Sequence, residues 1–160
     1  MSQKQSSTST TKSKELKIVT KYVATLDDVK NDLRKLKVLY IISFFNDISE
    51  KALQHLIYNM KERGYQLYQD FMVISGAPFS KALKNDLTIL LYVGLLETNV
   101  KKKLSLTSLG KEVIRECLEK VPGIDKDSIS KLVSELKPKI ALIDAEVELA
   151  FRGAKRRRSK

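Results

Sequence analysis

The polar residues of segment 79–93 have the types and spacing that a DNA-reading helix needs. They are Ser80, Lys81, Lys84, Asn85 and Thr88. Most recur three or four residues apart, so a helix would bring them to one face. Lysine can reach guanine or phosphate, asparagine can form two hydrogen bonds with adenine, and threonine can touch a thymine methyl group. We therefore expect this face to enter a major groove. The alternative is an ordinary solvent-exposed face.

Two cationic segments accompany this helix. Lys101, Lys102 and Lys103 lie between two short strand candidates, 95–98 and 104–107, and would form the tip of a β-hairpin. Near the C-terminus, an acid-free segment supplies Lys155, Arg156, Arg157 and Arg158. Both segments are expected to hold phosphates through counter-ion release without reading bases. The alternative is that they only keep a turn and a tail soluble.

The net charge of +11 is concentrated near the ends of the chain. Residues 1–14 hold three lysines and no acid, and residues 152–160 hold six basic residues and no acid. The remaining body, 15–151, is nearly balanced, with 21 basic and 19 acidic residues. A high isoelectric point alone therefore says little about nucleic-acid binding by the body.

The sequence offers no set of residues suited to catalysis or metal binding. Cys117 is the only cysteine and His55 the only histidine, so neither a disulfide nor a zinc site is expected. We expect no enzyme activity, no catalytic or metal-binding residues and no cofactor. No apolar run approaches the ~20 residues of a membrane helix, and no signal-peptide pattern begins the chain. The expected location is the cytoplasm, in association with the nucleoid.

Apolar spacing and turn signals predict a mainly helical chain. In the first half, the polar segment 1–14 should be disordered. Segment 15–24 suits either a strand or a helix. Segment 65–75 is expected to be extended, with a helix as the alternative. Helices are expected over 26–45 and 50–63. A turn is expected at 76–78.

The second half should contain four helices and a hairpin. The helices are expected over 79–93, 108–121, 126–137 and 139–151, the last beginning at Pro138. Inward positions of the first include Leu83, Leu87, Leu90 and Leu91, and those of the second include Leu109 and Val113. Residues 153–160 should form a disordered basic tail.

Segment 80–114 resembles the winged helix-turn-helix regulators of the MarR and PadR kind. The resemblance rests on GLLE (94–97) and LTSLG (106–110), where Gly110 would let the following helix approach the hairpin closely. KVLYIISF (37–44) and GAPFSKALKNDL (76–87) also resemble a group of archaeal and bacterial winged-helix proteins. The resemblance implies a mainly α, α+β fold with a short β-hairpin wing and extra N- and C-terminal helices. One departure is the long connection 65–78, where a helix-turn-helix has a short turn.

These observations divide the chain into a winged-helix domain, 15–121, and a helical extension, 122–152. Two apolar surfaces are larger than the core of a small domain requires. They are the seam of 26–45 and the side of the last helix formed by Ile140, Ile143, Val147 and Phe151. They are expected to form a homodimer interface. The alternative is that these helices fold back onto their own chain. The expected function is a dimeric transcriptional regulator, of archaeal type, that binds double-stranded DNA. The alternatives are a protein-interaction module in a replication, partition or transcription assembly, and RNA binding.

Overall fold

A computed structural model describes residues 24–159, with side chains through Ala154. It is 63% helical and contains two small antiparallel hairpins, which gives a mainly helical α+β fold. The helices are α2 (Leu26–Lys30), α3 (Leu33–Ile42), α4 (Glu50–Glu62), α5 (Lys81–Tyr92), α6 (Ser108–Lys120) and α7 (Lys126–Ser159). The expected disordered segment 1–14, and all of 15–24 but its last residue, lie outside the described residues. No helix within the described part is long and apolar enough to cross a membrane.

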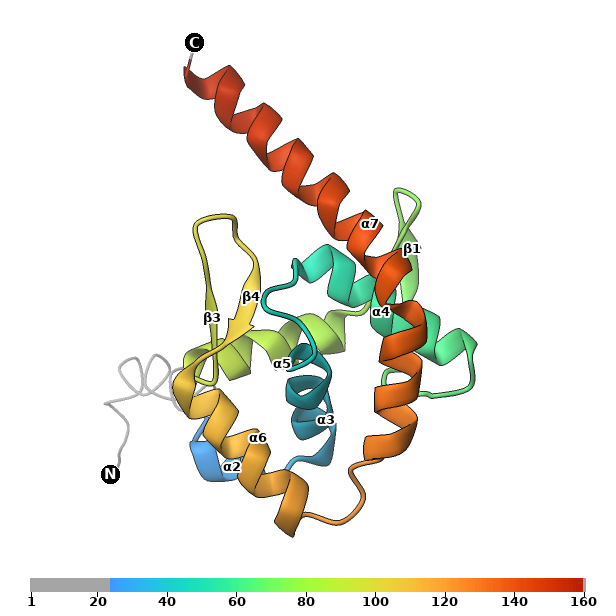
Figure 1. Cartoon of the computed structure of the whole chain (residues 1–160), viewed down its shortest axis with the longest axis vertical. Coiled ribbons are helices and arrows are strands. Elements are labelled where there is room, and N and C mark those ends of the chain that lie inside the picture. The colour runs from blue at the N-terminus through green and yellow to red at the C-terminus, as the bar shows by residue number, and fades with distance from the viewer. Residues whose placement is uncertain (1–23, 160) are drawn as a thin grey trace, which may run out of the picture.

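The two hairpins stand at opposite ends of α5. The β1–β2 hairpin (Met72–Ile74 and Ala77–Phe79) leads into the start of α5, and the β3–β4 hairpin (Leu96–Thr98 and Leu104–Leu106) follows its end (Figure 1). In the β3–β4 hairpin, Leu96 pairs with Leu106 and Thr98 with Leu104. Leu104 also exchanges two backbone hydrogen bonds with Ile48, at 2.9 and 2.7 Å, so the hairpin is tied to the segment before α4.

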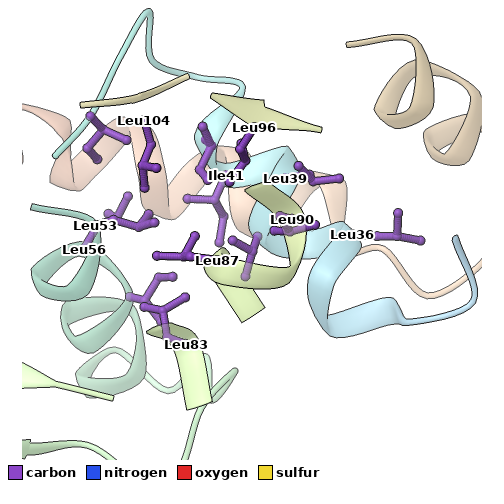
Figure 2. Close-up of a cluster of buried hydrophobic side chains, with 14 of the residues drawn as sticks. Leu36, Leu39, Ile41, Leu53, Leu56, Leu83, Leu87, Leu90, Leu96 and Leu104 are labelled. Atoms are coloured by element: carbon purple, nitrogen blue, oxygen red, sulfur yellow. The ribbon is translucent and has the colours of Figure 1, made fainter. Parts of the chain in front are cut away.

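The core forms where the apolar faces of α3, α4 and α5 meet. Figure 2 shows their leucines converging with Leu96 and Leu104 from the β3–β4 hairpin. α3 is buried on several sides, since Leu36, Val38 and Ile41 are all fully covered. Val38, Leu39, Ile41 and Ile42 are buried and Tyr40 is partly buried, all within their own chain. The apolar seam of 26–45 is therefore mostly unavailable as a dimer interface.

The prediction of one helix over 26–45 was wrong. The helix is interrupted at Asn31 and Asp32, because the Asp32 side chain accepts a hydrogen bond from the Lys35 amide and begins α3 anew. Thr25 begins α2 with a reciprocal capping box formed with Asp28. Aspartate is common at the N-cap of helices. The apolar spacing continues on both sides of Asp32, so spacing alone predicted one unbroken helix.

The prediction of separate helices over 126–137 and 139–151 was also wrong. α7 is continuous from Lys126 to Ser159, with Pro138 inside it. Proline removes one helical hydrogen bond, but packing holds the helix on both sides of it, since Val133, Leu136 and Ile140 are buried. The backbone is helical from 153 to 159, where we expected a disordered tail. The C-terminal part of α7 extends away from the rest of the molecule (Figure 1).

Residues 65–75 contain less strand than expected. Only Met72–Ile74 is a strand, and it turns through Ser75 and Gly76, both at positive φ, to pair with Ala77–Phe79. The predicted turn at 76–78 therefore lies one residue earlier, and most of GAP belongs to β2. The preceding residues form irregular chain, which places the Tyr68 ring in the core.

Two side chains expected to face inward are instead partly exposed. Leu91 on α5 is 36% exposed and Leu109 on α6 is 39% exposed. The other inward positions of α5, Leu83, Leu87 and Leu90, are buried as predicted. Leu91 and Leu109 lie at the edges of their apolar faces, where spacing alone does not decide burial.

Gly110 supplies the close approach expected of it. A Cβ atom there would lie 2.2 Å from the carbonyl oxygen of Leu95, so α6 and the segment entering β3 are in backbone contact. Gly76 differs, because it has open space around it but a φ of +80°.

We predict that Gly110→Ala will destabilise the protein by about 3 kcal/mol, because α6 must move to relieve the clash. Gly76→Ala should cost about 1 kcal/mol, from backbone strain alone. Urea unfolding followed by circular dichroism measures both free energies. Equal stability of Gly110→Ala and the parent protein would contradict the observed packing.

Candidate nucleic-acid interface

The outward face of α5 carries the polar residues that the sequence predicted for it. Lys81, Lys84, Asn85 and Thr88 are all exposed. The Thr88 hydroxyl donates to the Lys84 carbonyl at 3.0 Å. The Lys84 ammonium lies 3.2 Å from Glu50 on α4, in an exposed ion pair. Such pairs contribute little and exchange readily, so this face presents lysine, amide and hydroxyl groups to solvent.

Ser80 does not belong to this face. It is fully buried and serves as the N-cap of α5, where its hydroxyl accepts from the Leu83 amide at 3.0 Å. The same hydroxyl donates to Asp70, and the Ser80 amide and carbonyl both bond to the side-chain amide of Gln54. Its predicted role in DNA contact was therefore wrong, since these bonds use its polar groups to fix the start of α5.

The opposite side of α5 is held by a buried carboxylate. Asp86 is 3% exposed and accepts hydrogen bonds from the Tyr68 hydroxyl at 2.5 Å and from Arg34 at 2.8 and 3.2 Å. Lys35 adds an ion pair at 3.4 Å. Burial, with the Asp86 bond adding to it, raises the pKa of Tyr68, so this phenol remains a donor. The cluster fixes the rotation of α5 about its axis.

Sequence reasoning missed this cluster. Its only local signal was an aspartate beside Leu87, on the side of the helix that holds the leucines. A buried carboxylate needs cationic or hydrogen-bonding partners, and these come from residues distant in sequence.

The three lysines of the β3–β4 hairpin have different environments. Lys102 is exposed, with a positive φ of 61°. The Lys101 ammonium is 2.5 Å from Glu148 on α7. Lys103 is buried, its side chain only 8% exposed, and its ammonium lies 2.8 Å from Asp144 on α7. The expectation that Lys103 would contact phosphate is wrong for this conformation, because its charge is enclosed by carboxylates.

Three acids surround these lysines and form what we call the carboxylate cluster: Asp47, Asp144 and Glu148. Asp47 and Glu148 lie 3.8 and 3.6 Å from the Lys103 ammonium. Burial alone would raise the pKa of Asp144, but hydrogen bonds from Lys103 and Ser49 hold it below its ordinary value. The hydrogen bond from Lys101 lowers the pKa of Glu148. Asp144 and Glu148 are therefore ionised near neutral pH.

The predicted phosphate contacts of the basic C-terminal segment stay a prediction. The side chains of Lys155, Arg156, Arg157 and Arg158 lie outside the described residues, although their backbone continues α7. Arg152, one turn earlier, is exposed and lies 3.4 Å from Glu148.

Two apolar surfaces outside the core are also exposed. Met72, Val73 and Ile74 on β1 are 58, 65 and 49% exposed. On α7, Leu142 and Leu149 are 69 and 65% exposed. Contiguous apolar exposure of this kind marks interaction surfaces in many proteins.

The lone cysteine and histidine are placed as structural residues. Cys117 is buried in α6, and burial raises its pKa, which lowers its reactivity. His55 on α4 is half-buried, and burial with nearby Lys51 and Lys139 lowers its pKa. Among the described residues, no group of histidine, cysteine and acidic side chains is arranged to hold a metal ion.

We predict that Asp144→Asn will lower the free energy of unfolding at neutral pH by about 1–2 kcal/mol, since a charged hydrogen bond is weakened. The pKa of Asp144 is lower in the folded protein than in the unfolded chain. The stability that Asp144 contributes is therefore fully present above its unfolded-state pKa, and it is lost as the pH falls through its folded-state pKa. The gap between the two proteins should therefore narrow below about pH 4. Urea titrations at several pH values measure it, with exposed Glu146→Gln as control. A gap independent of pH would contradict the ion pair.

Comparison with known proteins does not place the chain in a family. Searches against protein-family models, curated proteins and solved structures gave no match. Its function is therefore inferred from the groups that the fold presents: the polar face of α5, the lysines of the β3–β4 hairpin and two exposed apolar surfaces.

Proposed function

We propose that this protein is a winged helix-turn-helix DNA-binding protein, acting as a dimeric transcriptional regulator of nucleoid DNA. The observation that carries the proposal is the division of α5 into two faces. Asp86 and three leucines hold one face in the core, while Lys81, Lys84 and Asn85 face solvent. A helix about 10–12 Å across fits the major groove of B-DNA, about 12 Å wide.

The order of the elements supports a winged-helix reading. α3, α4 and α5 are followed by the β3–β4 hairpin and then α6. In this reading α5 is the recognition helix, the β3–β4 hairpin is the wing, and exposed Lys102 is its phosphate contact. The basic residues 155–158 would extend the phosphate contacts beyond the body.

The connection between α4 and α5 departs from the short turn of a helix-turn-helix. Residues 63–80 intervene and include the β1–β2 hairpin. Despite this insertion the start of α5 is pinned to α4, since Gln54 bonds both backbone groups of Ser80 at 3.2 and 2.8 Å. The two helices are thus held in a defined relation through side chains.

The exposed stripe of α7 supports a dimer formed by a second copy of this chain. Leu142, Ala145 and Leu149 are exposed and recur at spacings of three and four, the pattern of a two-helix seam. A helical segment projecting alone in water is marginally stable without packing.

This interface replaces the one expected from the sequence. Ile140 is buried in its own chain, and Ile143, Val147 and Phe151 are half-buried. The free stripe therefore lies on a different side of α7.

A second candidate function is a protein-interaction module in a nucleoprotein assembly. The β1–β2 hairpin favours it, because Met72, Val73 and Ile74 are exposed while no residue between 71 and 80 is charged. An uncharged apolar strand edge suits a protein partner better than a phosphate backbone.

We predict salt-dependent binding of duplex DNA. Each phosphate contact contributes about −0.9 to the slope of log affinity against log salt. Lys81→Ala combined with Lys84→Ala should therefore flatten the slope by about 2 for every sequence. Asn85→Ala should change sequence preference by about 1–3 kcal/mol at one base pair. Fluorescence anisotropy with labelled duplexes measures both.

A matched control for this prediction is Lys131→Ala. Lys131 is exposed on α7 and lies beside Arg63, at the C-terminal end of α4. Lys84 instead pairs with Glu50, at the N-terminal end of α4, so the two lysines are far apart. Its replacement should leave the salt slope unchanged. Absence of duplex binding at low salt, or an equal effect from Lys131→Ala, would reject α5 as the DNA-reading element.

We predict two chains per particle in sedimentation equilibrium at micromolar concentration. Replacing Leu142 and Leu149 by glutamate should produce monomers, because each buried leucine contributes about 1.5–3 kcal/mol. Val73→Glu, which alters an apolar residue of similar exposure on β1, should leave the dimer intact. A monomeric parent protein would rule out the α7 interface.

A further inference from the structure

The β3–β4 hairpin is attached to α7 through charges. Lys101 and Lys103 both point to acids of α7, with nitrogen–oxygen distances of 2.5 Å to Glu148 and 2.8 Å to Asp144. Asp47, from the segment before α4, lies 3.8 Å from Lys103 and accepts a hydrogen bond from Asn99 at 2.8 Å. The carboxylate cluster thus draws on two regions remote from the hairpin in sequence.

Ion pairs are the described contacts between this hairpin and α7, and Val100 and Phe151 line a pocket beside them. A cleft of about 330 Å³ separates the body, the hairpin base and α7, and Lys103, Asp144 and Glu148 line it. At the tip of the hairpin, Val100 is 88% exposed. The tip is therefore positioned mainly by ion pairs, and these respond to competing charges in a way that apolar contacts do not.

The same geometry withholds two of the three hairpin lysines from an outside ligand. Lys103 is 8% exposed, so its ammonium cannot reach a phosphate while it contacts Asp144. Lys101 remains 44% exposed, but Glu148 occupies its ammonium. Carboxylate and phosphate oxygens bind a lysine ammonium in the same way. The α7 acids therefore occupy the positions that phosphates would take.

We propose that α7 is an autoinhibitory latch on the β3–β4 hairpin, whose Asp144 and Glu148 substitute for DNA phosphates on Lys103 and Lys101. The latch rests on the proposed DNA-binding function and adds its regulation. In the latched state, α5 and Lys102 contact DNA while Lys101 and Lys103 stay on α7. Movement of the hairpin away from α7 adds both lysines to the interface.

The test compares duplex binding by the parent protein and by Asp144→Asn combined with Glu148→Gln. Asparagine keeps an oxygen for the Ser49 amide, which now donates to Asp144 at 2.8 Å. The double variant should bind a labelled duplex of mixed sequence roughly two- to tenfold more tightly at low salt, since surface ion pairs of this kind no longer compete. Its salt slope should steepen by about 1 for each lysine released.

Three further variants separate release of the latch from a simple change in charge. Glu146→Gln removes one acid from the same turn of α7, and Glu146 makes no described ion pair with the hairpin. Its affinity change gives the general effect of one lost negative charge. Glu148→Gln alone provides a milder release. Adding Lys101→Gln to it should abolish the gain, which a double-mutant cycle measures.

Each outcome decides for or against the latch. Tighter binding and a steeper slope, both dependent on Lys101, support it. Weaker binding would overturn it and show that the acids position the hairpin for DNA. Glu148→Gln and Glu146→Gln each remove one negative charge, so an equal gain in DNA affinity from both would also overturn the latch. If the parent protein and all variants fail to bind duplex, the proposed function fails. If the parent protein binds with the predicted Lys81 and Lys84 dependence but the latch variants add nothing, only the latch fails.

Discussion

The burial of one carboxylate determines what the rest of this molecule can present. Asp86 would be costly to bury alone, and a buried ion must be matched by hydrogen-bond donors. Tyr68 and Arg34 supply them from two separate parts of the chain, and the Arg34 guanidinium also lies 4.7 Å from the centre of the Tyr68 ring. Rotation of α5 would break these contacts together. Because this side is fixed, the lysines and the asparagine of the other side keep one direction.

α7 connects three features that would otherwise be separate. Its first half packs along α4 and completes the core through Ile129 and Val133. Its middle supplies Asp144 and Glu148 to the lysines of the β3–β4 hairpin. The same turns expose Leu142 and Leu149 on another side, and the strongly basic residues 152–158 follow. In the proposed function, one helix therefore links the core, the charge state of the wing and pairing with a second chain.

The two hairpins differ in chemistry as well as place. The β3–β4 hairpin is cationic and is held by acids, whereas the β1–β2 hairpin is uncharged and exposes Met72 and Val73. Electrostatic contacts act over longer distances and weaken with salt, while apolar contacts need close fit. In the proposed function, the cationic hairpin at one end of α5 contacts a polyanion, and the apolar hairpin at the other end is left for a protein partner.

Local pattern determined much of this structure. Apolar spacing and caps located α4, α5, α6 and the β3–β4 hairpin within about two residues. Spacing of three and four along α5 correctly separated its buried leucines from Lys84 and Asn85. These features depend on residues within one or two helical turns. Charge pairing across the fold did not appear in the sequence, because Lys103 meets Asp144 and Asp86 meets Arg34 only after distant segments pack. Likewise, the continuity of α7 through Pro138 depended on contacts with α4. Tertiary packing alone decided which cations remained free, because an ion pair is a property of distance in space.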